Sequence, residues 1–380
     1  MLRGRTAYDI LNSIAIFCIL SNAVLYLDTI PVLRWGFSGL RAFAVLYAFL
    51  IALPQLRFGK FAVTVGIFYF AAGLITVMHG GSIHTWLAYT INSLGIILMI
   101  YLTLLRSPRY TIQVLAVIFD IFIYANFFLT IFYPDGIFEE SYLLGLNRNS
   151  VGPSLICGLV IHYFAYRMQE RNWLTFVLLG IVSITTTIII ESMTSAVGCS
   201  LLTAFFFVPT KKLRRIALIV FFIFYLIFQA FLVYLQGDLS TNKKAAFFVE
   251  EVLQKDMSFT NRIYVWSDSY NLIQRSPITG YGMQNDEWFE THVTVKSAHN
   301  IIYQVLIFGG FVLLSIFLVI IYMSVMRAIK QSSELTLFAL FSICTFFFMM
   351  IMEAYSFVHI FIVLVLTYYS FEFSKEIDQS

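Results

Sequence analysis

Charged residues are scarce in this sequence. Asp, Glu, Lys and Arg make up 12% of its 380 residues, about half of the roughly 25% that is typical of soluble domains. Hydrophobic residues make up 60%, and the mean hydropathy is +0.84. These values exclude a soluble globular protein. They predict an integral membrane protein with a single transmembrane domain over residues 1–380 and no second, soluble domain.

Cysteine is rare, and the common catalytic motifs are absent. The four cysteines lie in apolar stretches without the spacing of metal ligands, so we interpret them as small packing residues. The sequence has no Asp-x-Asp pair, P-loop, His-Glu-x-x-His or Gly-x-Ser-x-Gly motif, which argues against hydrolytic, metalloprotease and ATP-driven functions. The Gly-Tyr-Gly triplet at 280–282 is too short for a nucleotide-binding fingerprint. We therefore expect no cofactor and no metal ion.

Long apolar stretches are abundant. A transmembrane helix needs about 20 mostly apolar residues, and the pattern predicts an all-α polytopic fold with about twelve such helices. The first apolar stretch is long for the core of a cleaved signal peptide, so we interpret it as a retained span. The predicted spans lie near residues 10–27, 40–53, 61–78, 86–105, 110–132, 151–166, 173–190, 195–208, 216–235, 301–323, 335–352 and 355–371.

Lysine and arginine are distributed unevenly between the predicted loops. When the spans alternate across the membrane, most basic residues fall on one side, including the Lys-Lys-Leu-Arg-Arg run at 211–215. The short loops on the other side hold only Arg34, Arg41 and Arg148. This asymmetry follows the positive-inside rule and predicts that both termini are cytoplasmic.

Two predicted outer loops, 133–150 and 236–300, are long. Long ordered loops in compact proteins are usually functional. The second loop contains a stretch over 260–274 whose pattern predicts an amphipathic helix, ended by the turn residues at 276–282. The face of this helix is marked by Arg262, Trp266, Ser269 and Ile273.

Several polar residues near the outer face are candidates for a functional site, and each has a structural alternative. His299, just before the span at 301, is either an interfacial hydrogen-bonding residue or part of a site with the basic residues of its loop. The segment 147–149 is either a turn, capped at Ser150, or part of the same site. Taken alone, Arg41 is an arginine whose side chain extends toward the membrane interface.

Acidic residues within or near the predicted spans are rare, and such residues are functional candidates because they are costly in the membrane. They are Asp120, Glu191 and Glu353. The turn at 191–195 is predicted to face the same outer cavity as the loops. Asp120 is either functional or paired with a tyrosine or asparagine inside the bundle.

The order of these motifs resembles that of a known superfamily. Arg-Ile-Tyr-Val-Trp at 262–266, Pro-Ile-Thr-Gly-Tyr-Gly at 277–282 and Ala-His-Asn at 298–300 precede a span with Gly-Gly at 309–310. Together with Leu-Asn-Arg-Asn-Ser-Val-Gly-Pro at 146–153, this order is similar to that of the O-antigen ligase and polymerase superfamily. The superfamily includes the Wzy-type polymerases of O-antigen, capsule and exopolysaccharide.

The resemblance implies a glycosyltransferase with a membrane fold related to the GT-C class. Its donor is expected to be an oligosaccharide on undecaprenyl diphosphate, used at the outer face of the bacterial cytoplasmic membrane. It also implies membrane lipid, and chain-length regulator and flippase proteins, as partners, and no nucleic acid. With no Asp-x-Asp motif to hold a metal ion, arginines are suited to stabilise the leaving diphosphate, because a guanidinium binds phosphate bidentately and stays charged.

On this basis we assign roles to individual residues. Arg262 and His299 are the predicted catalytic residues; His299 either handles the proton of the acceptor hydroxyl or contacts phosphate. The predicted diphosphate-binding residues are Arg148, Arg275 and Arg41. The predicted substrate-binding residues are Asn149, Asn300, Tyr281 and Trp266, the aromatic ones either stacking on sugars or anchoring the chain at the interface.

Two other functions remain open. A ligase would transfer a finished glycan from the same carrier lipid to another acceptor, and shared motifs do not separate it from a polymerase. A transporter or flippase would make no bond. Transporters usually show inverted repeats and broken helices around midplane charges, whereas the charges here cluster at the outer face.

Overall fold

The computed structural model describes residues 7–26, 31–53, 58–137, 141–234, 258–331 and 333–378, and within them the chain is helical without β-strands. Residues 236–257 of the long predicted loop lie outside this part. The elements are α1 (Ala7–Val24), α2 (Pro31–Ala52), α3 (Lys60–Met78), α4 (Ile83–Arg106), α5 (Pro108–Phe132), the 3₁₀ helix η2 (Arg148–Val151), α6 (Gly152–Arg167), α7 (Trp173–Ile189), α8 (Met193–Phe206), α9 (Lys211–Gln229), the π-helix η3 (Ala230–Tyr234), α11 (Ser258–Arg275), α12 (Asp286–Val293), α13 (Ile301–Ile329), α14 (Glu334–Met349), α15 (Phe357–Tyr368) and α16 (Ser370–Asp378).

The described parts of the predicted apolar stretches lie mainly in helices, so the all-helical fold is confirmed and fits a multi-pass membrane protein. Among the described residues, five helices are long and apolar enough to cross a membrane, namely α2, α3, α4, α5 and α13. A sixth span results if α15 and α16, which meet at a bend of 47°, are counted together. Shorter apolar helices include α7, α8 and α14. The number of twelve spans and the relation to the GT-C class stay predictions.

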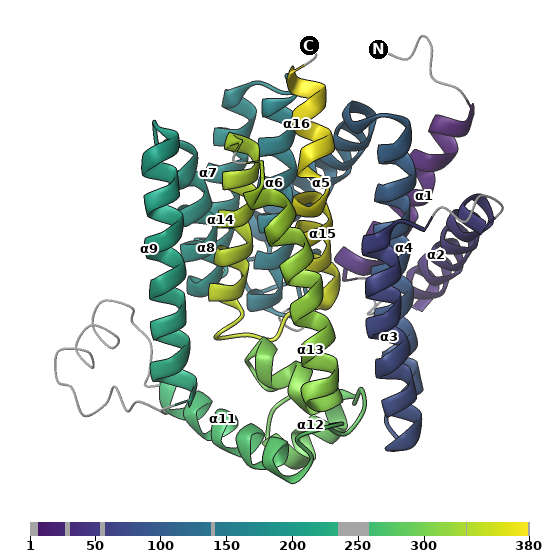
Figure 1. Ribbon diagram of the computed structural model, residues 1–380, viewed down its shortest axis with the longest axis vertical. Coiled ribbons are helices and arrows are strands. Elements are labelled where there is room, and N and C mark those ends of the chain that lie inside the picture. Colours follow the sequence, from purple (N-terminus) through teal and green to yellow (C-terminus); the bar gives the residue numbers. More distant parts are fainter. Residues whose placement is uncertain are drawn as a thin grey trace.

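The helices form a bundle whose centre is α6, α14 and α15 (Figure 1). Every residue of α15 from Phe357 to Tyr368 is buried. By contrast, α2 lies at the edge of the bundle, and only 17% of the residues in its most apolar stretch, Trp35–Ala52, are buried. Its exposed apolar side chains suit contact with lipid, because the bilayer interior takes the place of water around a transmembrane helix.

Ion pairs gather the basic ends of the helices at one end of the bundle. Arg106 at the end of α4 pairs with Asp9 in α1 at 3.0 Å, and Arg109 at the start of α5 pairs with Glu376 in α16 at 3.2 Å. Glu334 at the start of α14 pairs with Arg214 of α9 at 3.5 Å and with Arg167 of α6. The start of α1 and the helix α16 lie at this end, while α11 and α12 lie at the other (Figure 1).

Asp120 has partners other than the tyrosine or asparagine considered from the sequence. One carboxylate oxygen lies 2.8 Å from His162 Nε2, and the other accepts a hydrogen bond from Arg171 at 2.8 Å. The three residues come from α5, α6 and the connection between α6 and α7. The carboxylate therefore joins neighbouring helices within the bundle.

The Pro-Ile-Thr-Gly-Tyr motif docks into a break in α13. At Gly309 and Gly310 the backbone leaves helical geometry, with φ of 56° at Gly310. The backbone N–H groups freed there donate to the motif: Phe311 donates to the Pro277 carbonyl at 2.8 Å, and Val312 to that of Ile278 at 3.2 Å. In return, the N–H of residue 281 donates to the residue 307 carbonyl at 2.8 Å. This exchange satisfies backbone groups that a broken helix would otherwise leave unpaired, and it fixes the end of α11 against α13.

Candidate functional site

The segment before α6 is shaped by a capping box. Asn147 caps η2, because its side-chain oxygen accepts hydrogen bonds from the N–H groups of Asn149 and Ser150, both at 3.1 Å. Ser150 returns the contact to the Asn147 backbone. The cap is thus Asn147 with Ser150 as its reciprocal partner, where the sequence suggested Ser150 as the cap. The short helix directs Asn149 toward the interior, where its amide donates to Glu353 at 2.9 Å.

The predicted amphipathic helix is confirmed as α11. Its inward face follows the predicted spacing, since Trp266, Ser269 and Ile273 are buried, while Tyr264 and Tyr270 on other faces are exposed. Arg262 lies one turn before Trp266 on the inward face. The helical period therefore places Arg262 on the inward face of α11, where its guanidinium donates to Glu353, the residue that His299 also contacts.

His299 precedes α13 in a strained backbone conformation. Its φ is 47°, a left-handed value that is uncommon outside glycine. The neighbouring Asn300 is fully buried and caps α13 by accepting from the N–H groups at 302 and 303. The amide of Asn300 also donates to Gln229 at 3.2 Å. These contacts fix the chain on one side of His299, and the Trp266 indole donates to the His299 carbonyl at 3.4 Å on the other.

One buried carboxylate joins these three segments. Glu353, in the connection between α14 and α15, is 8% exposed. Its Oε1 accepts hydrogen bonds from Arg262 at 2.5 Å and from Asn149 at 2.9 Å, while its Oε2 lies 2.8 Å from His299 Nδ1. Arg262, His299 and Asn149, which the sequence assigned to one site, therefore meet at a residue that the sequence did not include in it.

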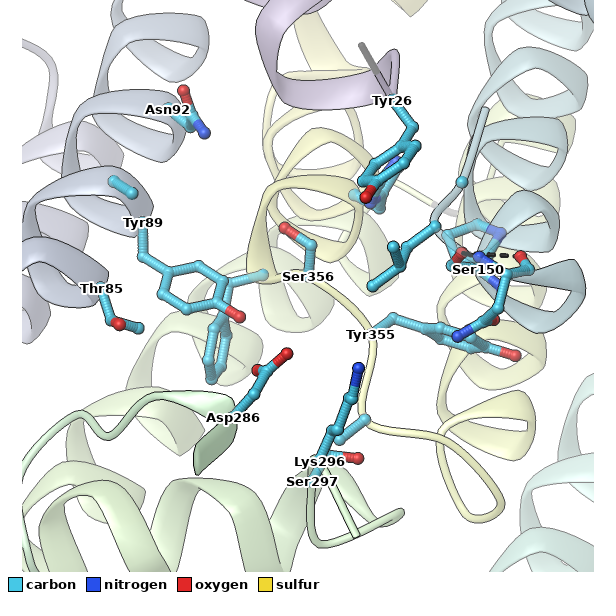
Figure 2. Close-up of a pocket in the computed structure, with 18 of the residues that line it drawn as sticks. Tyr26, Thr85, Tyr89, Asn92, Ser150, Asp286, Lys296, Ser297, Tyr355 and Ser356 are labelled. Atoms are coloured by element: carbon cyan, nitrogen blue, oxygen red, sulfur yellow. Dashed lines mark hydrogen bonds between the residues drawn. The ribbon is translucent and has the colours of Figure 1, made fainter. Parts of the chain in front are cut away.

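A polar cavity adjoins this cluster. Its volume is about 770 Å³, within the range of about 300–1,000 Å³ that is usual for ligand sites. It is lined by α1, α2, α4, the segment before α6, α12, residues 296–299 and residues 353–359. His299, Glu353 and Asn149 line it. Figure 2 shows Asp286 and Lys296 pointing into the space from the α12 side, with Tyr89 and Thr85 of α4 facing them.

The cavity carries charges of both signs. Lys296 and Arg41 line it, as do Asp286 and Glu287 at the start of α12. Arg41 also donates to Asn92 of α4 at 2.9 Å. Such a mixture of cations, carboxylates, hydroxyls and amides suits a ligand that has both an anionic group and many hydroxyl groups, because each needs directed hydrogen bonds.

Two tyrosines, Tyr355 beside the cluster and Tyr281 after α11, keep their protons. Burial raises the pKa of Tyr355, which lines the cavity, well above its usual value, and the charge of Glu353 adds to this rise. Burial also raises the pKa of Tyr281, although Arg275 opposes that rise. Both phenols are therefore neutral hydroxyl groups at any physiological pH.

Six of the nine sequence-assigned residues do not line the cavity, and one of these six, Arg262, is connected to it through Glu353. Arg148 is exposed and pairs with Glu191 at 3.3 Å. Arg275 is exposed at the far end of α11, 13 residues after Arg262, which is about 20 Å along a helix. The remaining three support the fold: Trp266 and Asn300 are fully buried, and Tyr281 donates to the Leu272 carbonyl at 2.9 Å. The roles assigned to these residues stay predictions.

The turn at 191–195 contacts the cluster through Asn149. Ser192 donates to the Asn149 side-chain oxygen at 3.2 Å, and Glu191 faces Arg148 outside the cavity. None of the residues of this turn lines the cavity, although the turn was expected to face it.

The structure adds Glu353, Lys296 and Asp286 to the residues that the sequence assigned. In the sequence, one feature pointed to Glu353, namely the rarity of carboxylates in apolar stretches. No sequence feature pointed to Lys296 or Asp286 except that both lie in the same polar loop. Within the described chain, no group of three or more His, Cys, Asp or Glu side chains is arranged to hold a metal ion.

Comparison with known proteins finds one family model that matches part of the chain. Residues 175–318 match the family model described as O-antigen ligase, and this match supports the resemblance to the O-antigen ligase and polymerase superfamily that the motifs indicate. Its members are glycosyltransferase-like enzymes that act on lipid-linked glycans, and they include both polymerases and ligase-like proteins. The matched segment contains Arg262 and His299 but not Asn149 or Glu353. No curated protein and no solved structure matches the chain.

Proposed function

We propose that this protein is a polysaccharide polymerase that joins oligosaccharide repeat units carried on undecaprenyl diphosphate. In this proposal the reaction takes place at the outer face of the bacterial cytoplasmic membrane. An acceptor sugar hydroxyl attacks the anomeric carbon of the donor, and undecaprenyl diphosphate leaves. The observation that carries the proposal is the convergence of Arg262, His299 and Asn149 on Glu353 at the wall of the cavity.

Charge stabilisation is the main requirement of this chemistry. The leaving diphosphate gains negative charge as the glycosidic bond breaks, and one cation at about 4 Å contributes about 4 kcal/mol at an effective dielectric of about 20. Even part of that gain in the transition state gives roughly two tenfold steps in rate. Lys296 and Arg41 line the cavity and are suited to this role. Arg262 does not line the cavity and supports the site by holding Glu353.

The position of the cavity fits substrates that arrive from two directions. It lies toward the end of the bundle that carries α11 and α12, opposite the basic end. Under the positive-inside rule the basic end is cytoplasmic, so the cavity faces outward. There a carrier lipid enters from the membrane and the growing glycan extends into the aqueous phase.

The proposal is tested with the purified protein and an undecaprenyl-diphosphate-linked repeat unit, in the presence of a chelator and without nucleotide. We expect a ladder of products on a gel. No product under any metal or nucleotide condition, with the protein folded, would contradict a glycosyltransferase that acts on this donor.

Ligation is the second candidate, because the matching family model is described as O-antigen ligase. A ligase uses the same donor but transfers the glycan to a different acceptor. The same assay separates the two functions. A single product that forms only when an acceptor lipid is added favours ligation, whereas a ladder without any acceptor lipid favours polymerisation.

A further inference from the structure

We infer that Glu353 is a positioning residue that fixes His299 as the general base of the reaction. Its carboxylate holds the proton of His299 on Nδ1, so that Nε2 is free to take the proton of the acceptor hydroxyl. This inference rests on the proposed function. It decides between the two roles that the sequence left open for His299, proton acceptor or phosphate contact.

The contacts of Glu353 determine the tautomer of His299. Oε2 of Glu353 lies 2.8 Å from Nδ1 of His299. A carboxylate can only accept a hydrogen bond, so the proton of this contact lies on Nδ1. In the neutral imidazole the other nitrogen then carries a lone pair. Nε2 forms no hydrogen bond within the described part of the chain, and His299 lines the cavity.

The backbone around His299 is held in place at a conformational cost. A φ of 47° for a residue other than glycine is a strained value that persists only where the surroundings enforce it, and it is typical of functional sites. Here the Trp266 indole holds the carbonyl of His299, and the next residue is the buried cap of α13. The imidazole is therefore oriented by the backbone as well as by Glu353.

The other contacts of Glu353 hold the carboxylate itself. Oε1 accepts from both Arg262 and Asn149, which come from α11 and η2. Two donors on Oε1 leave Oε2 to face His299. Arg262 also compensates the charge of a carboxylate that is 8% exposed, because a buried charge without a partner is costly.

The reaction moves one proton and exchanges one bond at the anomeric carbon for another. The acceptor oxygen forms the new bond to the anomeric carbon, and its proton passes to His299 Nε2. The bond between the anomeric carbon and the diphosphate oxygen breaks, and the diphosphate leaves with that electron pair. The imidazolium formed is stabilised by Glu353 through the Nδ1–H bond, and it returns its proton to water in the cavity.

Glu353→Gln tests this arrangement sharply because it keeps the size of the side chain. Arg262 and Asn149 are both donors, so the amide oxygen must occupy the Oε1 position, and the amide NH₂ must face His299. An NH₂ group donates, so Nδ1 becomes the acceptor and the proton moves to Nε2. We expect kcat to fall by about 100-fold or more, as for the loss of a general base, with KM changed by less than about threefold.

The tautomer is measured directly by ¹⁵N NMR of protein labelled at histidine. The sequence has six histidines, and the His299 signals are identified by comparison with His299→Gln. We expect a protonated Nδ1 and an unprotonated Nε2 in the wild type, and the reverse in Glu353→Gln. Glu290→Gln, at an exposed position of α12 outside the cavity, is the matched control and should change neither the spectrum nor the rate.

Each outcome supports or overturns the inference. A wild-type His299 that is protonated on Nε2, or on both nitrogens at neutral pH, overturns it, and so does a Glu353→Gln enzyme with unchanged kcat. Should Glu353→Gln fail to fold, the wild-type spectrum and Glu353→Asp decide, since Asp keeps a carboxylate and should keep the tautomer. If the wild type forms no product but shows the expected tautomer, the proposed function fails while the positioning by Glu353 stands.

Discussion

Arg262 and His299 bind the two different oxygens of one buried carboxylate. That carboxylate, Glu353, lies 91 residues after Arg262 and 54 residues after His299 in the chain. Three separate segments must therefore be in place before the cluster exists. Its contacts lead to predictions about catalysis, about the residues that support the cluster, and about the charge of the cavity.

Removal of either end of the Glu353 bridge should abolish activity. For Arg262→Ala and for His299→Ala we expect product formation to fall by about 100-fold or more, because each change removes a preorganised group from the reaction centre. Product is measured by the gel assay, and expression and elution profile report folding. Gln274→Ala, at an exposed position of the same helix as Arg262, is the control. Unchanged activity in both variants would rule out the site.

Trp266 should support His299 without touching the sugar. Its side chain is fully buried and its indole donates to the His299 carbonyl. For Trp266→Phe we expect the free energy of unfolding to fall by about 1 kcal/mol through loss of that hydrogen bond, with kcat lowered and KM changed by less than about twofold. Thermal unfolding and kinetics check this. A tenfold rise in KM at unchanged stability would instead favour stacking on a sugar.

Gly310 should tolerate no side chain. A Cβ there would lie 2.3 Å from the carbonyl carbon of Ile278, and its φ of 56° disfavours other residues. Gly310→Ala should therefore lower the free energy of unfolding by on the order of 2–3 kcal/mol and loosen α11 against α13. Gly66→Ala in α3, where no atom lies within 4 Å of the added carbon, is the control. Equal thermal stability of the two variants would contradict the docking role.

Lys296 should contribute to substrate affinity. It lines the cavity near Asp286, and its ammonium points into the space (Figure 2). For Lys296→Ala we expect kcat/KM to fall by about tenfold, which corresponds to about 1.4 kcal/mol for one solvated charge contact with an anionic substrate. The loss should shrink as salt is added, because salt screens exposed charges. Lys330→Ala, at the basic end of the bundle, should have no effect; equal losses in both variants would refute a local contact.

The sequence was sufficient for the membrane fold because apolar stretches report directly on bilayer spans. It also predicted α11 and its inward face, since Trp266, Ser269 and Ile273 recur at the helical period. The number of spans was harder to predict from the sequence. Several apolar helices, such as α8, are short, and length and composition alone do not establish whether each crosses the membrane.

Individual site residues were harder to predict from the sequence. Arg262, His299 and Asn149 were identified because polar residues in long predicted loops are unusual in so apolar a chain. Arg275 was assigned by the same criterion, yet it lies a further 13 residues along α11 on exposed surface. Composition gives no direction for a side chain, so it cannot separate an arginine in the cluster from one on the surface.

The sequence by itself determined that the chain is a helical membrane protein with long polar loops, because hydropathy and the helical period are local properties that each segment carries alone. Only the tertiary structure decided which polar residues meet. The fold brings α11, the start of α13, the segment before α6 and the α14–α15 connection together at Glu353. Such contacts depend on the packing of segments far apart in the chain, and the sequence of one segment does not specify which other segments it will contact.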